Sequence, residues 1–127
     1  MRSILFILIA IALMATTALA GNDAVPPISN SIKWATASEV DNFGFDVYRS
    51  DNEDGPFERI NESVIAGAGT SDTPNRYEYV DTAIAPETVY WYYVESISVS
   101  GKRKQFTPTL KSKPRSLPAD EATPSTD

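Results

Sequence analysis

Between Ser31 and Lys111, apolar side chains recur at every second position in short runs, and turn-forming residues separate these runs. A period of two is typical of strands that bury one face, and no run has the period of an amphipathic helix. The turns are spaced roughly 8 to 15 residues apart, which favours antiparallel strands in two layers. We therefore expect an all-β sandwich of six or seven strands.

The alternation also predicts where the strands lie. The expected strands are residues 31–37, 45–50, 57–60, 76–81, 89–99 and 104–111. A polar turn is predicted over residues 39–44 from Glu39, Asp41, Asn42 and Gly44, and Pro108 indicates that the last strand lies at an edge. Residues 61–75 are rich in Ala, Gly, Ser and Thr, so we expect a loop there with at most one short edge strand near Val64.

The first twenty residues have the features of a secretory leader. Arg2 supplies a positive charge, residues 4–14 are apolar, and small side chains at Ala18 and Ala20 suit the peptidase that removes such leaders. We expect a signal peptide over 1–20 and a secreted or periplasmic product, and a retained N-terminal anchor is the alternative. The remaining chain divides into a single sandwich domain over 21–112 and a disordered, proline-rich acidic tail over 113–127.

Composition excludes several classes of function. The chain has no histidine and no cysteine, so Ser-His-Asp and Cys-His nucleophiles, thiolate or imidazole metal sites and disulfides are ruled out. The 17 acidic against 11 basic residues give a net charge of −6, which disfavours nucleic acid and anionic membranes as partners. The basic cluster at Lys102, Arg103 and Lys104 is too small to reverse this. We expect no cofactor and no membrane insertion after removal of the leader.

A resemblance adds to this interpretation. The spacing Ile-x-Pro-x-Thr-x-Tyr from Ile84 to Tyr90, followed by Tyr92 and Val94, resembles the late strands of fibronectin type III domains. Trp34 stands where such domains place a core tryptophan. The sequence of residues 37–49, together with Arg59-Ile60-Asn61, resembles that of a bacterial secreted subgroup of these modules.

The resemblance implies a fold, two structural roles and a kind of function. It implies an immunoglobulin-like, fibronectin type III-like sandwich in which Trp34 fills the core and the Tyr90 hydroxyl bonds to the backbone at the preceding corner. The interval from Gly21 to Trp34 is short for this family, so the first strand is short or missing and leaves an open edge. The function implied is a non-catalytic, exported binding or spacer module that recognises protein partners through its surface.

The period of two also identifies a candidate binding face. If Tyr90 and Tyr92 face the core, then Tyr48, Trp91 and Tyr93 lie together on the opposite face of one sheet. Their polar companions would be Asp46, Arg49 or Glu95. Such rings stack on sugars or anchor proteins, which makes a carbohydrate-binding module one alternative function. The structural alternative is that the rings only cover one another across the strands.

Other functions have weaker support in the sequence. Asp51, Glu53 and Asp54 with Asn52 suggest a calcium loop, but they lack the required spacing and suit an ordinary turn. Catalysis would need a convergent carboxylate pair drawn from Glu39, Asp46, Asp81 and Glu95, and a sandwich of this size offers no obvious cleft. We therefore expect that the chain is not an enzyme. An open edge could also pair with a neighbouring chain, which makes an assembly subunit another alternative function. The expected oligomeric state is a monomer or weak self-association. The partner is an unknown protein or glycan at the cell surface.

Overall fold

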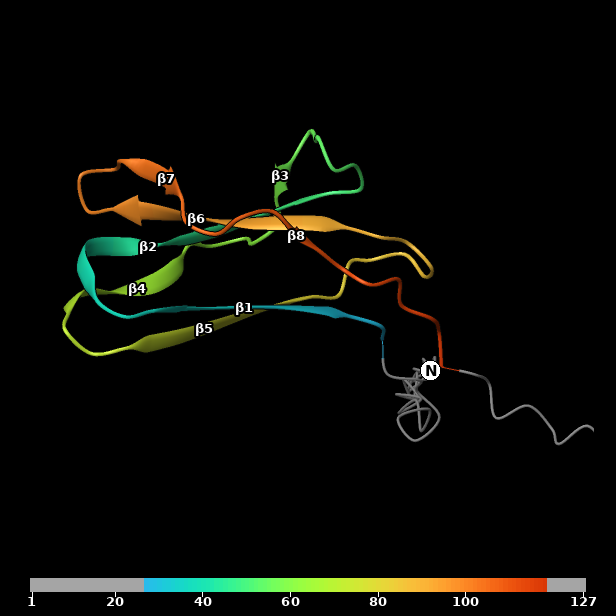
Figure 1. Cartoon of the computed structure of the whole chain (residues 1–127), viewed down its shortest axis with the longest axis horizontal. Coiled ribbons are helices and arrows are strands. Elements are labelled where there is room, and N and C mark those ends of the chain that lie inside the picture. Colours follow the sequence, from blue (N-terminus) through green and yellow to red (C-terminus); the bar gives the residue numbers. More distant parts are fainter. Residues whose placement is uncertain (1–26, 119–127) are drawn as a thin grey trace, which may run out of the picture.

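The computed structural model describes residues 27–118, which fold as two stacked antiparallel sheets without a helix (Figure 1). The predicted all-β sandwich is therefore confirmed. Residues 27–118 form eight strands where six or seven were expected, and three of the eight have only two or three residues. The strands are β1 (Asn30–Thr36), β2 (Glu39–Ser50), β3 (Glu58–Arg59), β4 (Ile65–Ser71), β5 (Asn75–Asp81), β6 (Trp91–Ser98), β7 (Arg103–Gln105) and β8 (Leu110–Lys111).

Some predictions lie outside the described residues. These are the leader over 1–20, the start of the domain over 21–26 and the end of the tail over 119–127. Residues 113–118, the first part of the predicted tail, are in neither helix nor strand. The described part of the chain contains no helix that is long and apolar enough to span a bilayer.

The smaller sheet consists of β1 and β5 alone. The two strands pair over seven positions, and Trp34 lies opposite Tyr77. Burial alternates strictly along β1, with Ile32, Trp34 and Thr36 facing inward. Within residues 27–118 no strand pairs with the second edge of β1. This sheet is therefore a ribbon whose stability depends on the layer above it.

The larger sheet has β2 and β6 at its centre. They pair from Asn42 opposite Ser98 to Ser50 opposite Trp91. The other edge of β2 carries β4 along its first half and β3 near its end, and the other edge of β6 carries β8 and β7 in the same way. The result is a six-stranded sheet that is four strands wide, because two strands share each of its outer positions (Figure 1).

The core lies between the two sheets and is rich in aromatic rings. Trp34 stacks on Tyr77 with ring centroids 5.6 Å apart and meets Phe45 edge-on at 5.5 Å. The chain has no disulfide, so ring packing and apolar burial must hold the layers together. The buried members of this cluster are Ile32, Trp34, Phe45, Val47, Tyr90, Tyr92 and Val94.

The prediction for residues 61–75, a loop with at most one short edge strand near Val64, was wrong in the length of that strand, because β4 is an edge strand of seven residues. Its small residues allow a close approach to β2. A side chain at Gly67 would place its Cβ 2.8 Å from the backbone oxygen of Asn42, and one at Gly44 would meet the oxygen of Ile65 at 2.5 Å. Gly67, which suggested a loop, is thus needed for strand pairing at a place where β2 also bulges.

The predicted turn over residues 39–44 was also wrong, because β2 begins at Glu39 and the reversal takes only Ala37 and Ser38. Asp41 adopts a φ of 49°, and two register shifts absorb the irregularity. The predicted last strand over 104–111 divides into β7 and β8. The backbone breaks at residues 106 and 107, where both amides turn to the carbonyl oxygen of Val94 instead of forming a regular ladder.

Candidate functional site

The outer face of the larger sheet brings two of the three predicted binding residues into contact. Tyr48 and Tyr93 are cross-strand partners, and their rings stack with centroids 4.9 Å apart and planes 14° from parallel. Phe57, on the loop before β3, packs against Tyr93 at 5.0 Å. All three side chains are half-buried. Each ring of the tyrosine pair therefore covers one face of the other.

Trp91 lies on the same outer face, two positions before Tyr93 on β6, but its contact is of a different kind. The Nζ atom of Lys111 on β8 stands 5.8 Å from the centroid of the Trp91 ring. This is the geometry of a cation–π interaction at a partly exposed site. The predicted trio is thus a stacked pair with Trp91 beside it under a lysine, and the face is not an open platform of three bare rings.

Of the three polar residues predicted to accompany these rings, Glu95 lies beside them. Its Oε1 atom accepts a hydrogen bond from the Tyr48 hydroxyl at 3.2 Å. Burial, together with the nearby Glu95 charge, raises the pKa of both Tyr48 and Tyr93. These two phenols therefore stay neutral across the physiological range and act as apolar surface with a hydrogen-bonding edge.

Asp46 was predicted to be an outward polar companion and is instead fully buried. It points to the outer face, but Asn61 and Arg103 cover it, each bonding one carboxylate oxygen at 2.8 Å. Arg103 also bonds Glu95 at 2.7 Å, so one guanidinium bridges two carboxylates. The loop that carries Asn61 is held over the sheet because the Oδ1 atom of the Asn61 side chain also accepts a hydrogen bond from the backbone N–H of Val47 at 2.8 Å.

The prediction that Arg49 accompanies the rings was wrong, because this side chain faces the other way. Its Nη1 atom bonds both oxygens of Asp81 on β5, at 3.1 and 3.0 Å, and lies on the inner side of the sheet. Asp81 is buried and also accepts the Tyr92 hydroxyl at 2.7 Å. Burial and the bond to Asp81 raise the pKa of Tyr92 strongly. This cluster ties the two sheets together.

Glu39 is a third buried carboxylate, and the sequence predicted it to lie in a turn. It accepts hydrogen bonds from the Thr36 hydroxyl at 2.9 Å, the Ala68 amide at 3.1 Å, the Tyr77 hydroxyl at 2.5 Å and the side chain of Asn42. Burial opposes its ionisation, but these four donors outweigh burial and lower the pKa of Glu39. The same bond and burial raise the pKa of Tyr77 to about 12.

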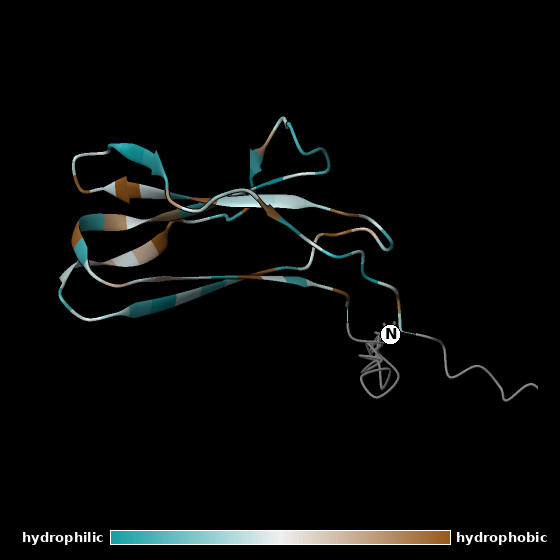
Figure 2. Cartoon of the chain, viewed as in Figure 1, coloured by the Kyte–Doolittle hydropathy of each residue, from teal (hydrophilic) through white to brown (hydrophobic). Residues whose placement is uncertain are grey.

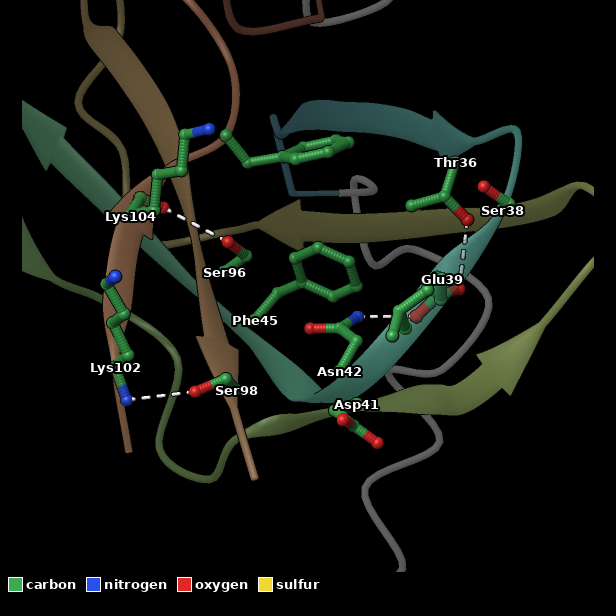
Figure 3. Close-up of a pocket in the computed structure, with 12 residues that line it drawn as sticks. Thr36, Ser38, Glu39, Asp41, Asn42, Phe45, Ser96, Ser98, Lys102 and Lys104 are labelled. Atoms are coloured by element: carbon green, nitrogen blue, oxygen red, sulfur yellow. Dashed lines mark hydrogen bonds between the residues drawn. The ribbon is translucent and has the colours of Figure 1, made fainter. Parts of the chain in front are cut away.

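A pocket of about 350 Å³ opens beside Glu39, between the β1–β2 turn and the β6–β7 hairpin (Figure 3). Phe45 and Phe106 form its apolar part, with centroids 5.6 Å apart, and Lys102 and Lys104 stand on one side. Hydrophobic stretches of β2 and β6 gather at this end (Figure 2). Sequence reasoning missed this pocket, because its walls come from segments predicted as separate turns.

A groove of about 500 Å³ runs beside the unpaired edge of β1. Its floor contains Ile32 and Tyr92, and the opposite wall is the segment from Leu110 to Arg115. The groove is lined by four basic residues and no acidic ones: Lys33, Lys111, Lys113 and Arg115. The sequence did predict a free edge here, but it assigned residues 113–115 to a disordered tail and so missed the wall.

The remaining candidates from the sequence lie in the core and in the turn that follows β2. The Tyr90 hydroxyl accepts the backbone N–H of Ala85 at 2.9 Å, and Trp34 is 7% exposed within the core. The acidic segment from Asp51 to Asp54 forms a turn in which Asn52 accepts the amides of Asp54 and Gly55, both at 3.0 Å. These carboxylates are exposed.

Comparison with known proteins gives one informative match. The chain is 34% identical over 89 residues to an amylopullulanase from Thermoanaerobacter thermohydrosulfuricus. The matched region is 69% of this chain but only 5% of the relative, so the similarity concerns a small segment of a much longer enzyme. No protein-family model matches the chain. No solved structure matches it either.

Proposed function

We propose that this chain is a non-catalytic, exported accessory module of the fibronectin type III kind that acts by binding a protein partner. The observation that carries the proposal is the edge of β1 that no strand within residues 27–118 pairs with, together with the groove beside it. An edge strand presents backbone donors and acceptors to solvent, and an extended segment of another chain can pair with them. No bond is made or broken in this role.

Two further observations support a recognition role over a catalytic one. The buried carboxylates Glu39, Asp46 and Asp81 are each held by several internal hydrogen bonds, so their charges serve the fold. The relative that matches is an enzyme, and the match covers about one twentieth of its length. An accessory segment attached to a larger exported protein fits both points.

Site-specific photo-crosslinking in the source cells tests the proposal. A benzoylphenylalanine at Ser31, on the exposed face of β1, should form a covalent adduct with one protein partner, which mass spectrometry identifies. The matched control carries the same group at Glu78 on β5, which is also exposed on this sheet. An adduct from Ser31 and none from Glu78 is the expected result. If neither position gives an adduct under export conditions, recognition through this edge is wrong.

A second candidate function is glycan binding, which the matched relative favours because its name denotes action on α-glucans. The outer face offers Tyr93, Phe57 and Trp91 as partly exposed rings. Stacking of a sugar on an aromatic ring needs one free face with polar groups beside it, and Glu95 and Arg103 lie beside these rings.

Affinity electrophoresis in gels containing pullulan or amylopectin tests the second candidate. Binding retards the chain, and Trp91→Ala should abolish the retardation if this face holds the glycan. Phe106→Ala is the matched control, because that ring is 41% exposed but lies at the end pocket. Equal mobility in gels with and without polysaccharide would exclude glycan binding and leave the protein-binding proposal standing.

A further inference from the structure

The groove beside β1 has a charge that contrasts with the rest of the chain. The whole sequence carries −6, yet the four charged residues that line the groove are all basic. None of them forms an ion pair within the described residues, where the salt bridges belong to Arg49, Arg59 and Arg103. The Lys111 ammonium lies over the Trp91 ring, so the charges that face the groove are those of Lys33, Lys113 and Arg115. A locally positive groove in an acidic protein attracts a negatively charged ligand.

The groove also has walls that are fixed before any ligand arrives. On the wall opposite β1, the Ser112 amide donates to the Tyr90 carbonyl at 2.8 Å, and the Ser112 hydroxyl accepts the Tyr90 amide at 2.9 Å. Further along, Arg115 Nε donates to the side chain of Asn30 at 3.0 Å and joins the wall to the start of β1. Figure 1 shows the chain after β8 running down to this end of β1. A preformed groove lowers the ordering cost of binding.

The shape and chemistry of the groove suit an extended backbone. One side is the strand edge from Asn30 to Lys33, with backbone groups free for pairing, and the floor is apolar where Ile32, Tyr92 and the partly exposed Leu110 meet. A strand added there would form ladder hydrogen bonds with β1 and place every second side chain on this floor. Its other side chains would face the lysines at the rim.

From these features we infer that the groove binds an extended, acidic segment of a partner protein, with apolar side chains alternating with carboxylates, as an added strand on β1. This inference rests on the proposed protein-binding function and names the chemistry of the partner. The unpaired edge of β5 is a poorer site, because acidic and basic residues such as Glu58, Glu62 and Arg59 mix along the cavity beside it.

Occupants from this chain suit the groove less well. A second copy would bring an equally basic groove against the first. Residues 119–127 are acidic but have no apolar side chain larger than alanine, and Pro124 lacks an amide hydrogen. Residues 21–26 hold one acid, Asp23, and would have to reverse direction at Pro26 and Pro27 to lie beside β1.

Fluorescence anisotropy with defined peptides tests the inference. The probe is a fluorescein-labelled, amidated peptide of sequence DVEVTVE, and the controls are KVKVTVK, which reverses the charge, and DVEPTVE, which interrupts the strand. We expect the purified exported chain to bind the probe at least tenfold more tightly than either control. Raising NaCl from about 0.05 to about 0.5 M should weaken binding several-fold, since the groove charges are exposed to solvent.

Charge-reversal variants test whether the groove is the binding site. The double variant Lys33→Glu/Lys113→Glu should reduce affinity for the probe about tenfold or more. The matched control Lys102→Glu/Lys104→Glu makes the same change in net charge at the opposite end and should bind like wild type. Amide chemical-shift changes should centre on residues 30–33. Retained affinity in the first variant, equal binding of the lysine peptide, or shifts centred on β5 would each overturn the inference.

Two more measurements distinguish the other occupants. Sedimentation that shows a dimer sensitive to Lys33→Glu would assign the groove to a second copy and contradict the inference. Tighter probe binding after Asp120→Asn, Glu121→Gln and Asp127→Asn together would assign it to the acidic tail. If the Ser31 crosslink forms but the probe does not bind, only the acidic-strand inference fails. Loss of both results removes the proposed function as well.

Discussion

The Tyr77 hydroxyl donates a 2.5 Å hydrogen bond to Glu39 and thereby joins the two sheets. Tyr77 belongs to β5 in the two-stranded layer, and Glu39 begins β2 in the larger one. The same tyrosine ring stacks on Trp34. Glu39 forms no ion pair within residues 27–118, and a buried carboxylate held only by four hydrogen-bond donors is stable only while every donor stays in place. Glu39 is therefore a structural anchor whose loss should be felt in both layers.

Glu39→Gln should lower the free energy of unfolding at pH 7 by about 1–3 kcal/mol, because an amide cannot accept all four donors. The pKa of Glu39 is lower in the folded protein than the ordinary value of 4.5. The carboxylate's contribution is thus complete above pH 4.5 and is lost as the pH falls through the lower folded value. Urea unfolding between pH 3 and 7 should show the difference between wild type and variant shrinking at the acidic end. A difference that is constant with pH would contradict this assignment.

Tyr90→Phe should destabilise the chain by about 1–3 kcal/mol, because the Ala85 amide loses its acceptor. Tyr93→Phe is the control, since the contacts that hold Tyr93 are ring contacts with Tyr48 and Phe57. Thermal melting followed by circular dichroism measures both. Equal melting temperatures for Tyr90→Phe and wild type would remove the corner role from this hydroxyl.

Trp34→Ala should cost about 3–5 kcal/mol, because it leaves a cavity between Tyr77 and Phe45 in a core that has no disulfide to compensate. Trp34→Phe should cost clearly less. The indole N–H of Trp34 is buried without a hydrogen-bond partner in the described residues, so phenylalanine gives up packing volume but no hydrogen bond. Chemical denaturation gives the free energy of unfolding of each variant. A larger loss of stability for Trp34→Phe than for Trp34→Ala would contradict this prediction.

Asp46→Ala should destabilise the chain by about 3–5 kcal/mol, because it leaves the Asn61 amide and the Arg103 guanidinium without their shared acceptor beneath the outer face. Arg103→Gln should have a smaller effect, since its side chain is 46% exposed and water can replace its contacts. Urea titrations of both variants at low and high salt provide the test. Added salt should reduce the difference in the free energy of unfolding between Arg103→Gln and wild type more than it reduces the difference between Asp46→Ala and wild type.

Alternation of side chains predicted the parts of this fold in which one face of a strand is buried. Trp34 and Tyr92 follow the period of two, and both lie in the core. The stacked pair of Tyr48 and Tyr93 follows from the same rule, because cross-strand neighbours on one face are brought together by the register.

The rule fails where a polar residue is buried by partners that are distant in the sequence. Asp46 was expected to be exposed, but its cover comes from Asn61 and from Arg103, 57 positions away. Glu39 resembles a turn residue until Tyr77 and Ala68 are placed beside it. Small residues also mislead, since Gly67 is as typical of a loop as of a strand that must approach its neighbour closely.

The segment that leads into β1 and the segment that follows β8 lie at the same end of the sandwich (Figure 1), and Arg115 links them to each other through Asn30. Tension applied to both ends would therefore act first on the hydrogen bonds that hold this outgoing segment, which are the bond from Arg115 to Asn30 and the bond from the Glu87 amide to the Arg115 carbonyl, before any load reached the core. The basic groove lies at this same end, between β1 and the outgoing segment. The β6–β7 hairpin would project away from it into solvent.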